Sequence, residues 1–304
     1  HQIFEVFKYL SGNQNFDLYA YSNSEKEDFI THQLKGFFKY WRIVWNLNDS
    51  DLLKTIKLDQ IDILIDLSGH SKGNRLEVFF NKPSPIQVSW VGYLASTGLK
   101  EIDYIIADKN SITEKEEYQF TEKIYRLNNT WTVLKPEYDI PLIEEIPFIR
   151  NKYITFGSFN NIQKINSTVI KGQLIFEDAY ERNDLLNKYN SIDIALDTFP
   201  YNGGTTSLEA SWMGVPVLTK KGNSFLSKCG ESINISLGLD DWICGSDLDY
   251  INKATEMSKN TDKLQLVKSY LINNRKNFKI FNSKIFSDEL AAAFKHMVSI
   301  YNNA

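Results

Sequence analysis

The sequence is poor in cysteine, in long apolar runs and in excess charge of either sign. Its two cysteines, Cys229 and Cys244, are too few for a disulfide framework and suit a reducing compartment. No apolar run approaches the roughly 20 residues that a membrane-spanning helix needs, and the opening residues do not read as a secretory leader. A formal net charge of −4 without a basic run argues against a nucleic-acid surface. These features predict a cytoplasmic globular protein that binds neither nucleic acid nor a membrane.

Strands alternate with helical segments along the chain, which is long enough for two α/β domains. We expect a helix capped by Ser50 and ending near Leu58, and a terminal amphipathic helix over 288–301. The terminal helix is expected to place Leu290, Phe294, Met297 and Tyr301 on one face. The segment 135–147 carries three prolines and four acidic residues and is predicted to be the linker between the domains. Further strands are expected at residues 16–21, 61–67 (buried), 86–91, 104–107 and 153–159, with a short helix over 75–80.

Residues 191–219, SIDIALDTFPYNGGTTSLEASWMGVPVLT, are the most informative stretch. Residues 192–196 are apolar and β-branched, which predicts a strand buried on both faces. The turn cluster 200–204 contains Gly203 and Gly204, which can take backbone angles closed to other residues. A second strand is expected from residue 215.

Between these strands, Thr205 and Thr206 are expected to cap a helix that runs to about Met213 and stops at Gly214. A strand, a glycine turn and a helix N-terminus together present N–H groups and the positive end of a helix dipole to an anion. Glu209, one turn into the helix, is placed to accept hydrogen bonds from ribose hydroxyls. The alternative is an ordinary turn in an α/β protein.

This stretch resembles the donor-site segment of the SPINDLY-type O-linked N-acetylglucosaminyltransferases, a glycosyltransferase family. Further blocks match over nearly the whole chain and in the same order, and two C-terminal segments agree with bacterial members. The blocks are residues 66–76 (DLSGHSKGNRL), 85–93 (PIQVSWVGY) and 156–161 (FGSFNN) with Lys164; the C-terminal segments are 225–232 and 237–239. The resemblance implies an α/β protein of the GT-B fold, in which two Rossmann-like domains face each other across a cleft.

On this resemblance the chain divides into three parts. Residues 1–147 form an N-terminal Rossmann-like domain on the acceptor and sugar side, and residues 148–283 form the domain that binds the nucleotide sugar. Residues 284–304 form a terminal helix that packs back on the first domain.

The chemistry that the resemblance implies is transfer of a sugar from a nucleotide diphosphate to a hydroxyl. The protein must then stabilise the departing diphosphate, hold the sugar and orient the acceptor. Thr205 and Thr206 are expected to bind the β-phosphate, and Lys164 to supply a positive charge to the same phosphate. Asn161 is expected to line the same pocket.

The sugar side of the predicted site is a loop in the first half. Val91, Gly92 and Tyr93 resemble the loop that faces the donor sugar, and Gly92 permits a close backbone approach. Leu94 and Ala95 depart from the commoner family pattern Gly-Tyr-Pro-Gly-Thr, which leaves the shape of the sugar pocket open.

The uridine side is expected on the helix that precedes Asp193. Family members often carry a histidine near the base there, and this chain has Leu185 at the matching position. Arg182 and Lys188 remain as polar candidates for contacts with the nucleotide. For Arg182 the alternative is a solvated helix residue.

Histidines are the candidate general bases, because imidazole titrates near neutral pH. His70 follows the strand 61–67 and is either this base or a structural histidine that holds its loop. His1 either matches a histidine of the family's active site, with residues missing after it, or is an unrelated leading residue. His32 and His296 have no motif around them and are predicted to be surface residues.

Asp247 and Asp249 have the Asp-x-Asp spacing with which GT-A enzymes bind manganese. They fall at an expected helix start, where aspartates cap, and the GT-B resemblance implies no metal. We therefore expect no cofactor apart from the nucleotide sugar, which is a co-substrate.

One region is shorter than the family pattern. Between the helix start at 165–171 and residues 173–176, family members have the rest of that helix, a further strand and another helix. A true deletion of that size would cost more free energy than the whole net stability of a domain. We infer that residues are missing between Lys171 and Gly172.

The sequence thus predicts an inverting, metal-independent glycosyltransferase that moves N-acetylglucosamine from UDP-GlcNAc to Ser or Thr hydroxyls of proteins. The alternatives are another donor, such as GDP-fucose or UDP-glucose, another acceptor, or a catalytically silent module that binds a nucleotide sugar or a partner protein. The tetratricopeptide array through which the family recruits protein acceptors is not part of this sequence.

Overall fold

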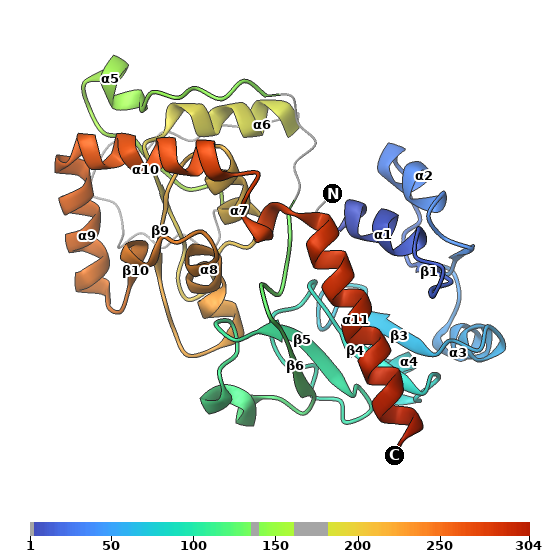
Figure 1. Ribbon diagram of the computed structural model, residues 1–304. Helices are drawn as coiled ribbons and strands as arrows, with labels where there is room; N and C mark the ends of the chain where they lie inside the picture. Colours follow the sequence, from blue (N-terminus) through green and yellow to red (C-terminus); the bar gives the residue numbers. More distant parts are fainter. Residues whose placement is uncertain (1–2, 135–139, 161–181) are drawn as a thin grey trace. The chain divides into compact units, whose positions relative to one another are not determined.

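The computed structural model describes residues 3–134, 140–160 and 182–304, which form two compact units (Figure 1). Unit 1 is His1–Val133 together with Asn282–Ala304, and unit 2 is Leu134–Phe281. The first division between the units thus falls at residue 133, before the segment that was expected to be the linker.

Unit 1 is built on a parallel sheet in which four strands lie in chain order, β3-β4-β5-β6. A separate parallel pair joins β1 to β2. The strands are β1 (Tyr19–Ser22), β2 (Tyr40–Ile43), β3 (Ile63–Asp66), β4 (Ile86–Ser89), β5 (Tyr104–Asp108) and β6 (Lys123–Leu127). Since β3 and β4 are parallel neighbours, the loops that follow them leave from the same edge of the sheet.

The predicted strands of unit 1 are present. β3 and β4 are shorter than expected, whereas β5 extends to Asp108. β3, which was expected to be buried, alternates between half-buried and buried residues. β3 ends at Asp66 because its side chain accepts hydrogen bonds from the N–H groups of Ser68 and Gly69, which turns the chain. β4 ends before Val91, whose positive φ of 60° takes the chain out of the extended conformation.

Five α-helices flank these strands in the described part of unit 1. They are α1 (Phe4–Ser11), α2 (Phe29–Lys35), α3 (Asp49–Leu58), α4 (Leu76–Phe80) and α11 (Ser283–Asn302). α3 ends at the predicted residue, but its N-cap is Asn48 and not Ser50. The Asn48 side chain accepts the N–H of Asp51 at 2.9 Å, so the helix starts before the serine.

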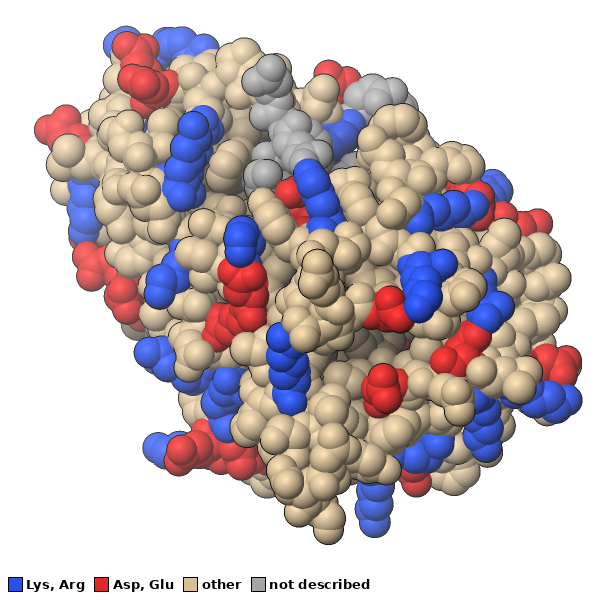
Figure 2. All heavy atoms as spheres, turned by 45° about the vertical axis from the view of Figure 1, so that its right-hand side comes forward, with Lys and Arg blue, Asp and Glu red and all other residues tan. Residues whose placement is uncertain are grey.

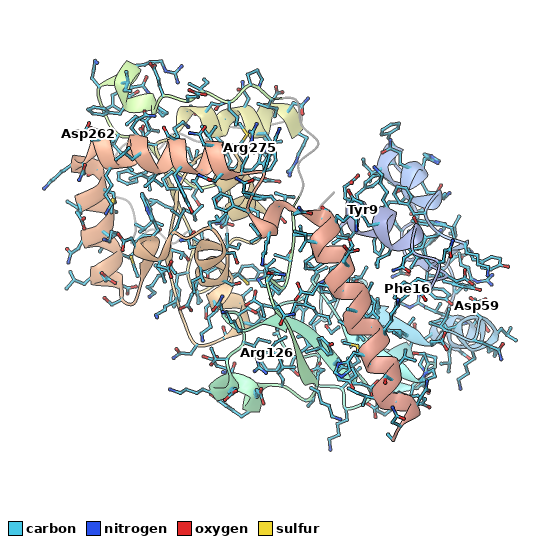
Figure 3. All side chains as sticks on the ribbon, viewed as in Figure 1. Tyr9, Phe16, Asp59, Arg126, Asp262 and Arg275 are labelled. Carbon is cyan, nitrogen blue, oxygen red and sulfur yellow. The ribbon has the colours of Figure 1, made fainter. Side chains whose placement is uncertain are left out.

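α11 packs on α1, β4 and β6 in unit 1, although it comes last in the chain (Figure 1). Its residues Leu290, Phe294 and Met297 are buried in the core of this unit, as expected. Tyr301 was placed on the same face and is 54% exposed, because the last turn of the helix extends past the core. Phe16, labelled in Figure 3, packs edge to face against Phe294 with ring centroids 6.4 Å apart.

Unit 2 contains a second parallel sheet, with the strand order β10-β9-β8-β7. The strands are β7 (Phe156–Gly157), β8 (Ile194–Leu196), β9 (Val217–Lys220) and β10 (Ile243–Cys244). β7 is much shorter than the strand expected over 153–159. β8 and β9 are almost wholly buried, in agreement with the apolar runs that predicted them.

The helices of unit 2 enclose two apolar clusters that share this sheet. They are α5 (Pro147–Asn151), α6 (Arg182–Lys188), α7 (Thr205–Trp212), α8 (Phe225–Ser236), α9 (Asp247–Lys259) and α10 (Thr261–Asn274). Pro147 was expected to close the linker and instead occupies the first position of α5, where its missing N–H costs nothing. The predicted gap between Lys171 and Gly172 lies outside the described residues.

Acidic and basic side chains are interspersed on the face of the molecule that Figure 2 displays. This agrees with the nearly balanced composition of 34 basic and 38 acidic residues. Among the described residues, no helix has the length and apolar character needed to cross a membrane.

Candidate functional site

The glycine turn of unit 2 connects the end of β8 to the start of α7. Gly204 is the N-cap of α7, with φ −94° and ψ −83°, and no side chain caps the helix. The prediction that Thr205 and Thr206 cap it is therefore wrong, because both already belong to its first turn. The start of α7 carries the positive end of the helix dipole, which favours an anion nearby.

Asp197, at the end of β8, fastens this turn to the sheet. Its Oδ1 accepts the N–H of Gly203 at 2.7 Å, and its Oδ2 accepts the hydroxyl of Thr219 on β9 at 2.7 Å. The side-chain amide of Asn160, which follows β7, donates to the same carboxylate. Burial raises the pKa of Asp197 to about 7, and these hydrogen bonds oppose the rise.

Asn160 also joins the turn to the helix, because the Thr206 hydroxyl donates to its Oδ1 at 2.9 Å. A Cβ at Gly203 would lie 2.5 to 2.9 Å from Oγ1 of Thr206, Oγ of Ser207 and Oδ1 of Asn160. Only glycine fits there, and the space left among these groups is about 10 Å³, too small for a ligand. The turn is thus a packed, hydrogen-bonded support for the start of α7.

Glu209 and Arg182 are brought together by α7 and α6. One carboxylate oxygen of Glu209 forms an ion pair with the Arg182 guanidinium, and the Glu209 side chain is 1% exposed. Arg182 is therefore a paired residue and not a merely solvated one. Lys188, in the last turn of α6, is half-buried, as is Leu185.

Two loops of unit 1 meet at the edge of its sheet, after β3 and β4. The imidazole of His70 lies edge to face against the ring of Tyr93, with centroids 5.4 Å apart. A Cβ at Gly69, whose φ is +50°, would overlap Tyr93, so the two loops can close only on glycine. His70 and Tyr93 were predicted from two different sequence motifs, and they are neighbours in the fold.

Val91 and Gly92 form the tight turn that carries Tyr93. A φ of 60° is strained for a β-branched residue such as Val91. Gly92 donates its N–H to the carbonyl of Trp90 at 2.8 Å, and a Cβ at this glycine would overlap the carbonyl of Leu67. Glycine is therefore required at position 92 because the backbone there lies close to the loop after β3.

Asp247 and Asp249 have partners that account for both side chains. Ser246 caps α9 by accepting the N–H of Asp249 at 3.1 Å, so the cap is the serine and neither aspartate. Asp249 accepts the N–H of Gly245 at 2.8 Å, and Asp247 is paired with Lys220. In the described ranges, no three His, Cys, Asp or Glu side chains are grouped as metal ligands would be.

Three predicted site residues, His1, Asn161 and Lys164, lie outside the described residues. His296 is exposed on α11, as predicted, and its Nδ1 lies 3.0 Å from the hydroxyl of Tyr125.

Comparison with known proteins finds one family over most of the chain. The profile described as glycosyl transferase family 41 matches residues 10–170 and 151–290. A tomato (Solanum lycopersicum) protein named "Probable UDP-N-acetylglucosamine--peptide N-acetylglucosaminyltransferase SPINDLY" is 28% identical over 82% of this chain and 32% of its own length. A rice (Oryza sativa subsp. japonica) protein of the same name is 27% identical over 93% of this chain and 36% of its own length. The chain thus spans about a third of the length of these relatives.

A solved structure of a mutant Thermobaculum terrenum O-GlcNAc transferase superposes with a TM-score of 0.89, at 27% identity. The match covers 98% of this chain and 65% of that one. Two parallel α/β units and this likeness define a GT-B-type fold. The chain belongs to glycosyl transferase family 41.

Sequence reasoning missed Asp197, Thr219 and Asn160, although they organise the turn. The available signal was a polar residue directly after β8, one near the end of β9 and one shortly after β7. Parallel strands end at one edge of a sheet, so such residues meet there.

Proposed function

We propose that this chain catalyses inverting transfer of N-acetylglucosamine from UDP-GlcNAc to Ser or Thr hydroxyls of proteins. The observation that carries the proposal is the start of α7, where the glycine turn held by Asp197 leads into a helix N-terminus whose dipole favours a diphosphate. The printed names of the tomato and rice relatives supply the donor and the peptide acceptor.

The roles of the residues follow from where charge develops. As the bond between the anomeric carbon and the diphosphate breaks, negative charge grows on UDP, and preorganised donors stabilise it. We assign this to the first turn of α7, with Thr205 and Thr206, and to Lys164. Arg182, Glu209, Lys188 and Asn161 are assigned to the nucleotide, and the loop 91–93 to the sugar.

We further propose that transfer needs no metal and takes place in the cytoplasm. A helix N-terminus and a lysine can meet the leaving charge without a divalent ion. The two cysteines are buried and form no disulfide, which suits a reducing compartment, and fractionation of source cells would test the location.

Nucleotide binding and turnover test the proposal together. UDP at a hundred times its dissociation constant should stabilise the protein by about 2.7 kcal/mol, and transfer to a Ser- and Thr-containing protein should persist in excess EDTA. Lys164→Ala should lower turnover by about 10²–10³ and leave UDP binding largely intact. Lys259→Ala, an exposed lysine of α9, is the matched control.

Each part of the proposal has its own opposing result. A thermal shift with GDP and none with UDP contradicts the uridine donor. UDP binding with no transfer from any nucleotide sugar contradicts an enzyme and favours a binding module. Activity that EDTA abolishes and manganese restores contradicts metal independence.

A further inference from the structure

The loop that carries Thr97 is fixed by a buried carboxylate in unit 1. Glu122 is 4% exposed and lies just before β6. Its Oε1 accepts the N–H of Thr97 at 2.7 Å and also the Thr97 hydroxyl. Its Oε2 accepts the hydroxyl of Ser96 at 2.7 Å and that of Thr121 at 3.2 Å. Both oxygens are thus occupied, and Thr97 itself is 3% exposed.

The carbonyl of Thr97 in turn holds the imidazole of His70. Nε2 of His70 lies 2.8 Å from this oxygen. A carbonyl oxygen only accepts, so Nε2 must carry the hydrogen, and the neutral ring then has its lone pair on Nδ1. No described residue is hydrogen-bonded to Nδ1, and His70 is exposed.

The other groups around His70 preserve this arrangement. Tyr93 packs against the ring, and Asp66 of β3 is its acidic neighbour. The Asp66 carboxylate is already hydrogen-bonded, because it accepts the N–H groups of Ser68 at 3.1 Å and Gly69 at 2.7 Å. Burial raises the pKa of Asp66, and the charge of Glu122 adds to that rise, while His70 opposes it. Neither carboxylate takes the proton from Nε2, since that hydrogen points at Thr97.

We propose that Glu122 is a positioning residue that, through Thr97, holds His70 in the Nε2–H form, with Nδ1 as the proton acceptor for the incoming hydroxyl. The inference rests on the proposed function. In the step, the hydroxyl O–H bond breaks and its proton goes to Nδ1. The oxygen bonds to the anomeric carbon, and the bond from that carbon to the diphosphate breaks, with the electron pair leaving on UDP.

A double-mutant cycle tests whether Glu122 acts through His70. His70→Ala should lower turnover by about 10²–10⁴, the usual contribution of a general base. Glu122→Ala should lower turnover at least about tenfold and leave UDP binding unchanged, because misplacing a reacting group reduces rate more than binding. In the His70→Ala background, Glu122→Ala should have no further effect. Glu122→Gln, which can still accept from Thr97, should restore most of the turnover.

Long-range ¹H–¹⁵N correlation spectra give a readout that does not depend on activity. The chain has four histidines, so His70→Ala assigns the signals of His70. At a pH where the ring is neutral, the wild type should show the Nε2–H tautomer. If Glu122→Ala does not fold, Thr97→Val removes only the hydroxyl contact and replaces it in the cycle.

Three results separate the inference from the function on which it rests. An active protein whose His70 is in the Nδ1–H form overturns the inference. So do independent, multiplicative effects of the two substitutions on turnover. A wild type that binds UDP and shows the Nε2–H tautomer, but transfers no sugar, rejects the proposed function and with it the role of Nδ1, while the arrangement of Glu122, Thr97 and His70 stands.

Discussion

Lys268 on α10 is a lysine inside the core of unit 2. Its side chain is 2% exposed, and no described residue accepts a hydrogen bond from its Nζ. Burial lowers the pKa of this amine to about 8 from 10.5, although the charge of Asp193 opposes the shift. A folded-state pKa below the unfolded one means that the fold disfavours the charged form. The resulting loss of stability is complete below about pH 8 and disappears as the pH rises past about 10.5.

Replacing Lys268 tests whether its buried amine lowers the free energy of unfolding at neutral pH. Lys268→Met keeps an unbranched chain and removes the charge, so the free energy of unfolding at pH 7 should rise by up to about 3 kcal/mol. The gain should shrink between pH 8 and 10.5 in thermal melts. Lys263→Met, on the same helix with an amine paired to the exposed Asp241, is the control and should change little. A less stable Lys268→Met at pH 7 would mean that the amine supports Asp193.

At the scale of an element, the turn between β8 and α7 depends on one carboxylate. Asp197 satisfies the N–H of Gly203 and the hydroxyl of Thr219, both of which are buried. Its pKa of about 7 lies above the unfolded value near 3.8. Its contribution to stability is therefore greatest below about pH 4 and is lost as the pH rises through 7.

Two substitutions of Asp197 should differ. Asp197→Ala leaves buried donors without acceptors, at about 1–3 kcal/mol for each group, and should weaken the stabilisation by UDP. Asp197→Asn keeps an acceptor for Gly203 and should retain UDP binding, with less loss of stability between pH 5 and 8 than the wild type. Melts with and without UDP measure both effects. Equal UDP shifts for the alanine variant and the wild type would separate Asp197 from the anion site.

Elements with a strong local signal could be predicted, and those defined by distant contacts could not. Helix 205–212 and the buried strands β8 and β9 follow from an apolar run, a glycine turn and a stop at Gly214. β2 and β6 were missed because their residues are mostly half-exposed and lack a clear apolar pattern. The roles of Asp197 and Glu122 depend on partners about 20 residues away or more along the chain, which spacing alone does not reveal.

At the scale of the whole molecule, unit 1 depends on a helix from the far end of the chain. Phe286 of α11 is 2% exposed and stacks on Trp90 with ring centroids 5.8 Å apart. Family resemblance predicted a terminal helix of this kind, but the aromatic pair that joins it to the residue after β4 was not visible in the sequence.

Phe286→Ala should therefore act on unit 1 alone. Removing a buried phenylalanine costs about 3–5 kcal/mol, so denaturant unfolding of unit 1 should move to a lower concentration. The UDP-dependent stabilisation of unit 2 should remain. Ile285→Ala, at a 39% exposed neighbour on the same helix, should have a small effect. Equal losses for the two variants would mean that the Trp90–Phe286 contact is not central to unit 1.

The position of α11 in the sequence also determines the order in which the two units can fold during synthesis. During synthesis, unit 2 is complete in sequence once Phe281 has been made, whereas the core of unit 1 runs from Val6 to Met297. A ribosome that adds about 5–20 residues per second reaches Met297 about one to three seconds after Phe281. Until then the apolar surfaces of α1 and β4 that α11 covers have no partner. Unit 1, whose strands precede unit 2 in the sequence, is therefore the later of the two units to close.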